Sequence, residues 1–244
     1  VLAQVGLGIE KVPPIFQEAK IPYFPAYTLA QVDMESEASF PVVPGILSQM
    51  GGGWIASHNK CEKPVWVLSE SPSTEFMKGL ATTGFKAGGG DPAAMTFVTF
   101  PMTQSDFAPV AAEVVGHNPD CIMPYLNETM NLQFYPALVQ TGWKDRDPER
   151  NRLMGYQGGV YTQRVLEEFP ELVEGLRAVD LSRAFNNPAW GEFSTILDDL
   201  KDDGLTNLTS SFTKHTYINF LAWVDTVKQV IADGDEVTNE TVFD

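Results

Sequence analysis

The chain is poor in basic residues: 16 Lys and Arg stand against 32 Asp and Glu over 244 residues, a formal net charge of -16. Proteins that bind nucleic-acid phosphates or anionic membranes present clustered positive charge, so this balance argues against both partners. The acidity either aids solubility or steers a cationic ligand toward the protein. Long apolar runs are absent too, and no segment approaches the roughly 20 residues needed for direct membrane insertion as a helix.

Cysteine is scarce, with only Cys61 and Cys121. Neither lies in a Cys-x-x-Cys motif, which argues against a zinc ribbon or a thioredoxin-type redox site. Cys121 lies in an apolar run and is most simply interpreted as a buried core thiol. The separation of the two residues along the sequence does not by itself support a disulfide, and it does not exclude one.

Catalytic and metal-binding motifs are also lacking. The sequence has no Gly-x-Ser-x-Gly elbow, no phosphate-binding loop and no His-Glu-x-x-His motif. Its three histidines are isolated, with no second ligand at metal spacing, so we expect no metal site. Gly6 and Gly8 resemble the start of a dinucleotide fingerprint, but Lys11 stands where its third glycine would be. We therefore expect no cofactor.

Short apolar strands alternate with helical patterns between residues 64 and 156. We predict strands at 65–68, 95–100, 120–123 and from 152, and helices at 75–86, 105–116 and 130–141. Ser105 is placed to cap the second of these helices and Gly142 to end the third, in which Pro136 introduces a kink or a later start. One helix between each pair of strands is the pattern of right-handed βαβ units, hence of a parallel sheet covered on both faces.

The residues on either side of this segment suggest a second unit of the same kind. We predict a strand at 1–5, a short helix at 12–19 and a strand end at 21–24, followed by an extended piece at 40–44 and helices at 188–200 and 216–232. The three glycines at 51–53 and the polar residues 58–60 are interpreted as a boundary. The prediction is an α/β protein with two Rossmann-like lobes, each a parallel sheet flanked by helices.

Ligands of parallel sheets bind at the carboxyl ends of the strands, in the loops that lead into helices. In this sequence those loops are rich in Tyr, Ser, Thr, Asn, Gln and Gly. Such residues offer neutral hydrogen-bond donors and acceptors and flat aromatic faces. None of the loops contains a convincing nucleophile with its base, so the pattern favours binding over catalysis.

Several short motifs follow one another in a characteristic order. Pro101 precedes an Asp106-Phe107 pair, Pro119-Asp120 leads into a strand, and the next helix ends at Gly142. With residues 1–8 and 18–22, this order resembles the branched-chain amino-acid-binding (leucine/isoleucine/valine-binding) family of type I periplasmic solute-binding proteins, which serve ABC transporters. The family's usual length is well above 244 residues. By this resemblance the fold is incomplete, a fragment lacking N- and C-terminal parts.

The resemblance implies that a ligand binds between two lobes, one formed by residues 1–60 and 181–244 and the other by residues 61–180, which close by a hinge. Carried over position by position, the contacts fall at Gly8, Ile9, Tyr27 and Thr28 of the first lobe and at Thr74, Tyr125, Asn127 and Gln157 of the second.

Two of these positions depart from the amino-acid binders of that family. The amino-acid binders of that family place a hydroxyl residue in the first loop, where this chain has Gly8 or Ile9. They also place an acidic residue in the fourth loop of the second lobe, where this chain has Gln157. A neutral amide cannot form the ion pair that holds an ammonium group strongly. The departures favour an aromatic or short carboxylic acid, an amide or a polyol over an α-amino acid. Glu128 is an alternative ammonium partner if the register shifts by one residue.

The resemblance thus implies the extracytoplasmic solute-binding subunit of an ABC importer, in the periplasm or anchored as a lipoprotein at the cell surface. It would capture a small polar organic molecule, deliver it to membrane permease subunits and catalyse nothing. One alternative is a ligand-sensing receptor module of the same fold. The other is an NAD-dependent α/β enzyme, which only Gly6 and Gly8 support.

Overall fold

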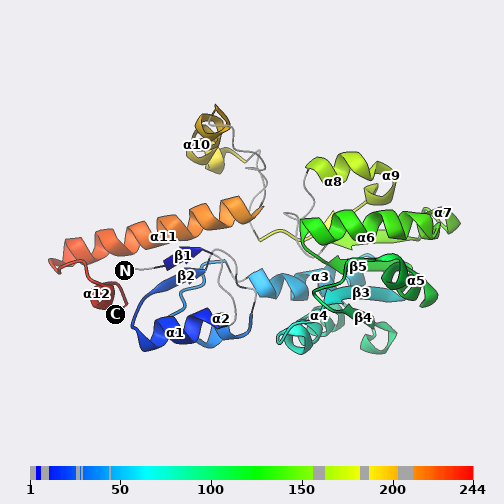
Figure 1. Cartoon of the computed structure of the whole chain (residues 1–244), viewed down its shortest axis with the longest axis horizontal. Helices are drawn as coiled ribbons and strands as arrows, with labels where there is room; N and C mark the ends of the chain where they lie inside the picture. Colours follow the sequence, from blue (N-terminus) through cyan, green and yellow to red (C-terminus); the bar gives the residue numbers. More distant parts are fainter. Residues whose placement is uncertain are drawn as a thin grey trace. The chain divides into compact units, whose positions relative to one another are not determined.

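The computed structural model describes residues 4–6, 11–25, 28, 30–43, 45–155, 163–181, 187–202 and 211–243. The chain divides into two compact units, Val1–Ile46 with Leu181–Asp244, and Leu47–Asp180. Figure 1 shows the helices and strands of both. The first boundary between the units therefore lies between Ile46 and Leu47, before the boundary expected near residue 60.

The second unit is built on a five-stranded parallel sheet, which contains the four predicted strands and one more that the pattern did not predict, β7. Its strands run in the order β4-β3-β5-β6-β7. Their bounds are Pro64–Ser69 for β3, Thr96–Phe100 for β4, Cys121–Tyr125 for β5, Arg152–Gly155 for β6 and Arg177–Ala178 for β7. The register of the central pair matches Pro64 with Cys121 and Leu68 with Tyr125.

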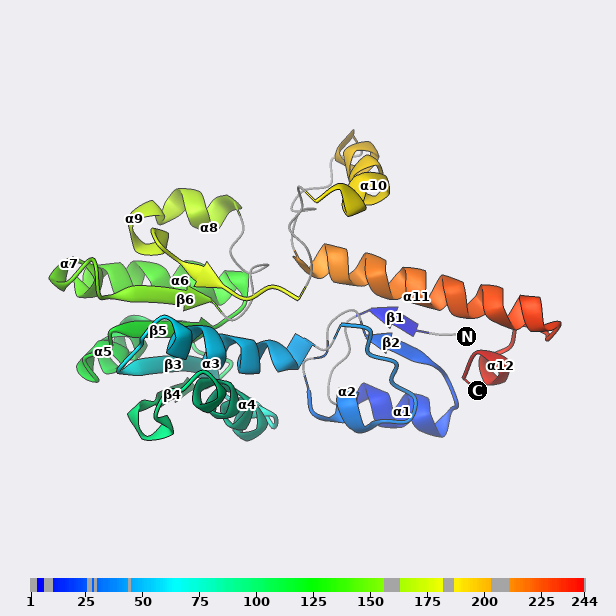
Figure 2. The ribbon, with the colours of Figure 1, turned by 180° about the vertical axis from the view of Figure 1, so that it is seen from behind.

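Helices cover both faces of this sheet. Helices α3 (Ser48–His58) and α4 (Thr74–Ala87) pack together, and α6 (Glu128–Gln140) contacts both α5 (Ala108–Gly116) and α8 (Gln163–Glu168). Figures 1 and 2 show α4 and α6 on opposite sides of the strands. The 3₁₀ turn η2 (Pro92–Ala94) and the short helices α7 (Trp143–Arg146) and α9 (Pro170–Val173) complete the unit. The chain runs from β3 to both sides of the sheet, and since crossovers between parallel strands are almost always right-handed, helices come to lie on both faces.

Two predicted helix ends can be compared with the structure. Gly142 follows α6 with a positive φ of 64°, which confirms its role as the residue that ends the helix. The proposed Ser105 cap is wrong, because α5 begins at Ala108 and its first N–H donates to the Asp106 carboxylate at 3.0 Å. Pro136 lies inside α6, as the pattern indicated.

Glycines bring α3 and α4 into backbone contact. A Cβ atom on Gly84 would lie 1.8 Å from the Met50 carbonyl oxygen, and one on Gly53 would lie 2.0 Å from the Ala81 carbonyl oxygen. No other residue permits so close an approach. The interpretation of residues 51–53 as a boundary is therefore wrong, since these glycines lie inside α3 and make it part of the second unit.

The core of the second unit lies between the sheet and its helices. Trp66 of β3 is fully buried and meets Phe85 of α4 edge-on, with 6.2 Å between ring centroids. On β5, Ile122 and Met123 are also buried. The apolar strands seen in the sequence are therefore enclosed on both faces, as expected of a parallel sheet.

The first unit contains a two-stranded parallel sheet of β1 (Gln4–Gly6) and β2 (Tyr23–Pro25). The long helix α11 (Ser211–Asp233) contacts both strands, and α1 (Val12–Glu18) and α2 (Val32–Glu35) lie on the other side of them (Figures 1 and 2). The remaining elements are η1 (Gly45–Leu47), which reaches the division between the units, η4 (Pro188–Trp190), α10 (Gly191–Asp202) and α12 (Asn239–Phe243). No helix within these described segments of the chain is long and apolar enough to cross a bilayer.

The two cysteines form a disulfide, with 5.8 Å between their Cα atoms. Cys121 is buried, as predicted, but its interpretation as a core thiol is wrong. The cause lies in the strand order. Because β5 pairs with β3 directly, the first residue of β5 lies beside the residues that lead into β3, although the two cysteines are 60 residues apart in sequence.

Candidate ligand-binding site

The topology of the second unit defines one position for a ligand. From β3 the chain moves to β4 on one side and then crosses to β5 on the other, so the strand order reverses between β3 and β5. The loops after these two strands lead to helices on opposite faces, α4 and α6, and diverge at the carboxyl edge of the sheet. Ligands of open α/β sheets bind at such switch points. This edge is the candidate site.

The loop after β3 is held in shape by Thr74, a predicted contact. The Thr74 hydroxyl accepts a hydrogen bond from the Ser71 N–H at 2.7 Å and donates to the Ser69 carbonyl at 3.3 Å. Its side chain is buried. Thr74 therefore fixes the backbone of the loop, and its hydroxyl group is already engaged on both sides.

The loop after β5 carries two further predicted contacts. Asn127 caps α6, because its side-chain oxygen accepts the Met130 N–H at 2.9 Å, and it is exposed. Tyr125 ends β5 and is half-buried, and desolvation raises the pKa of its phenol well above the usual range. The phenol thus stays protonated at physiological pH and can donate a hydrogen bond.

The other predicted contacts are placed differently. Thr28 belongs to the first unit, where it is fully buried and its hydroxyl accepts the Ile46 N–H at 3.3 Å. The structure brings Thr74, Tyr125 and Asn127 to one edge of one sheet. Four predicted contacts lie outside the described residues: Gly8, Ile9, Tyr27 and Gln157. The side chain of Glu128, the alternative ammonium partner, is also not described.

Acidic residues lie at the carboxyl edge of the sheet. Glu70 follows β3 and Asp106 follows β4, so both lie at the carboxyl edge, and the nearby Lys78 is paired with Glu75 at 2.7 Å. At the opposite edge, basic residues such as Lys63, Arg150 and Arg152 are interspersed with acidic ones such as Glu62, Asp120 and Asp147. An anionic ligand at the carboxyl edge would therefore depend on N–H and hydroxyl donors more than on salt bridges.

Glu70 is a further functional candidate, in addition to the predicted contacts. It is exposed, and its backbone N–H donates to the Phe100 carbonyl at 2.8 Å, which fixes the start of the loop. Its place directly after a buried strand was the available signal. A carboxylate there attracts positively charged groups.

No protein-family model matches the chain, and neither does any curated protein. Solved structures do match it. One is a solute-binding protein of an ABC transporter from Rhodopseudomonas palustris, in complex with p-hydroxybenzoic acid. It is 19% identical with a TM-score of 0.76, and the match covers 99% of this chain and 65% of that one.

Two further structures show the same likeness. A leucine-binding protein from Thermotoga maritima is 18% identical with a TM-score of 0.75, over 100% of this chain and 67% of that chain. A periplasmic binding protein type 1 from Bordetella pertussis is 14% identical with a TM-score of 0.69, over 98% and 66%. The fold is thus that of the type I periplasmic binding proteins, which confirms the predicted fold class. The chain spans about 65% of the length of the first of these structures.

Proposed function

We propose that this protein captures a small polar organic molecule outside the cytoplasm as the solute-binding subunit of an ABC importer. The observation that carries the proposal is the switch point between β3 and β5, which has the topology of a binding site and places Tyr125 and Asn127 together. Solute-binding proteins of ABC transporters that share the fold are described in complex with small aromatic acids. The same loops provide no nucleophile paired with a base, which supports binding without chemistry.

The disulfide supports the proposed compartment. Disulfides persist in the periplasm and at the cell surface and are rare in reducing cytosol. Cys61 and Cys121 are both buried beside paired strands. An extracytoplasmic protein, in the periplasm or held at the cell surface, fits this chemistry.

The two units are proposed to be parts of two lobes that close on the ligand, and the closed form would be recognised by the permease subunits. The second lobe would then be Leu47–Asp180, which includes α3, and the first lobe would combine the two outer segments. Under this proposal Tyr125 and Gln157 contact the ligand from the second lobe, where Thr74 and Asn127 hold the loops in shape, and Gly8, Ile9, Tyr27 and Thr28 lie on the side of the first.

A thermal-shift panel tests the proposal, with leucine, benzoate and 4-hydroxybenzoate as probes and NAD as the control for a dinucleotide enzyme. A ligand that binds only the folded protein stabilises it by mass action, so the melting temperature should rise with probe concentration. Titration calorimetry on the best probe then gives the Kd. No shift with any of the three probes, or saturable binding of NAD alone, would refute the transport function.

Two substitutions test the position of the site. Tyr125→Phe removes one hydroxyl and keeps the ring, so it should weaken binding of the best probe about tenfold while the protein stays folded, as its circular dichroism will show. Phe97→Leu on the edge strand β4 is the control, because it changes packing at a distance from the switch point. Equal affinities of wild type and Tyr125→Phe would remove Tyr125 from the site.

A further inference from the structure

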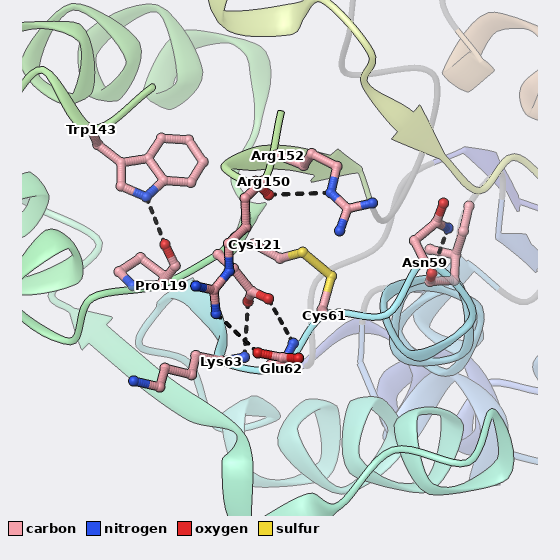
Figure 3. Close-up of a disulfide and its surroundings, with 11 residues drawn as sticks. Asn59, Cys61, Glu62, Lys63, Pro119, Cys121, Trp143, Arg150 and Arg152 are labelled. Carbon is pink, nitrogen blue, oxygen red and sulfur yellow. Dashed lines mark hydrogen bonds and ion pairs between the residues drawn. A yellow bond between two sulfur atoms is a disulfide. The ribbon is translucent and has the colours of Figure 1, made fainter. Parts of the chain in front are cut away.

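The disulfide lies at the amino edge of the sheet, at the start of the two strands that flank the candidate site. Cys61 precedes β3 and Cys121 is the first residue of β5. Both side chains are almost completely buried, with 6% and 1% exposed. Figure 3 shows the disulfide near Glu62 and Lys63, which precede β3, and near Arg150 and Arg152 at the start of β6.

Hydrogen bonds hold the same two strand starts together. The two carboxylate oxygens of Asp120, next to Cys121, accept the backbone N–H groups of Glu62 and Lys63 at 2.7 and 2.8 Å. The Glu62 carboxylate also pairs with Arg150 at 3.0 Å (Figure 3). The disulfide is therefore the covalent part of an anchor between β3 and β5.

The anchor and the candidate site are opposite ends of one strand pair. The paired register runs from Pro64 and Cys121 at the anchor to Leu68 and Tyr125 at the carboxyl edge. A slip of one residue would turn every side chain of a strand to the opposite face of the sheet. Fixing one end of so short a pair therefore fixes which residues reach the switch point.

We propose that the Cys61–Cys121 disulfide is a redox lock on the ligand site. While it is intact, β3 and β5 hold the register that places Tyr125 at the switch point, and its reduction loosens that end of the sheet and weakens ligand capture. This inference rests on the proposed function. It adds that binding depends on the oxidation state of a pair of residues that do not touch the ligand.

Coupling of this kind is reciprocal. A reductant thiolate can reach the buried sulfurs only after β3 and β5 separate at their starts, and a ligand that binds only the paired strands lowers the fraction in which they are apart. Dithiothreitol supplies two electrons and two protons in this reaction. Both cysteines become thiols, and dithiothreitol becomes its cyclic disulfide.

The first experiment measures reduction of the 244-residue chain by dithiothreitol, with the exposed thiols alkylated and counted by mass spectrometry. The probe is whichever of leucine, benzoate and 4-hydroxybenzoate gives the largest thermal shift. At a probe concentration of 100 times its Kd, reduction should slow about 100-fold. An unchanged rate would overturn the lock.

The second experiment compares affinities for the same probe. Cys61→Ser/Cys121→Ser should bind at least about tenfold more weakly than the oxidised wild type and should be indifferent to dithiothreitol. Affinity within twofold of the wild type would overturn the lock while leaving the proposed function intact. If the variant does not fold, the slowing of disulfide reduction by the bound probe, measured on the wild-type chain, tests the lock instead.

A third measurement needs no ligand and separates the lock from the proposed function. Hydrogen exchange of the reduced wild-type chain should accelerate along β3 and β5 as far as Leu68 and Tyr125, with β4 less affected. Acceleration confined to the residues next to the cysteines would overturn the lock even in a protein that binds its probe. Absence of binding to the oxidised chain would instead refute the proposed function.

Discussion

The contact between α3 and α4 makes a quantitative prediction, because α4 contains two glycines in opposite environments. Gly79 is exposed, and a Cβ atom built on it has nothing within 4 Å, whereas a Cβ atom on Gly84 would lie 1.8 Å from the Met50 carbonyl oxygen and 2.7 Å from its carbon. Replacing an exposed helical glycine by alanine stabilises a helix by about 1 kcal/mol. Gly79→Ala should therefore raise the free energy of unfolding by about that amount.

Gly84→Ala gains the same helix propensity but forces two helices apart. Normal contact between a methyl carbon and an oxygen requires a separation of more than 3 Å, and α3 also meets α4 at Gly53, where its backbone approaches the Ala81 carbonyl. Overpacking of this kind costs about 3 kcal/mol, so the variant should be about 2 kcal/mol less stable than the wild type.

The assay is urea unfolding of the two variants and the wild type, followed by tryptophan fluorescence and circular dichroism. With a denaturant slope of about 2 kcal/mol per molar, a 3 kcal/mol difference between the variants separates their midpoints by about 1.5 M. A midpoint for Gly84→Ala equal to or above that of Gly79→Ala would refute the close contact and the assignment of α3 to the second unit.

Three further sets of substitutions test the amino and carboxyl edges of the sheet. Cys61→Ala/Cys121→Ala opens a loop with a sequence separation of 60 residues, so the free energy of unfolding measured in urea should fall by about 4 kcal/mol. A fall of less than about 1 kcal/mol would contradict a structural role for the disulfide. Asp120→Ala leaves two backbone N–H groups without their acceptor and should lower the unfolding free energy by about 3 kcal/mol, whereas Asp120→Asn should lose less because its amide oxygen still accepts one of them. Asn127→Ala removes the cap of α6 and should cost about 1 kcal/mol in thermal unfolding, which Asn127→Asp should restore; equal stability of all three proteins would disprove the cap.

The sequence predicted the second unit well because local signals there agree with the tertiary structure. Its strands are short, apolar and buried on both faces, and its helices carry caps and stop signals at their ends, such as Gly142. The first unit offers weaker signals, since β1 and β2 are three residues each and most of the unit is helix or irregular. Element type followed from hydrophobic pattern wherever the segment was long enough to show one.

The glycines of α3 illustrate a local signal with two physical meanings. Residues 51–53 are three consecutive glycines, which favours a linker because glycine disfavours helix interiors. In the structure the missing side chains of Gly53 and Gly84 allow two helix backbones to touch. The stabilising contact is made with α4, which comes later in the chain, so no property of residues 51–53 alone reveals it.

The disulfide was undecidable from the sequence for a related reason. Whether Cys61 and Cys121 meet depends on which strands are neighbours. Along the sequence β4 lies between β3 and β5, but in the sheet β3 lies between β4 and β5. A sheet ordered β3-β4-β5 would place β4 between the two cysteines, about two strand spacings apart and beyond bonding reach. The reversal of strand order that creates the switch point therefore also makes the disulfide possible.

The candidate site shows how far residue type alone can assign a role. Hydroxyl and amide side chains in a loop serve either a ligand or the backbone that forms the loop, and Thr74 and Asn127 have their oxygens engaged by backbone N–H groups. Such residues give the loops their shape, and substituting them changes binding by moving the loop. The same edge also carries the phenol of Tyr125, a neutral donor, and the exposed carboxylate of Glu70, and these two groups suit a ligand that presents an acceptor to the first and a donor to the second.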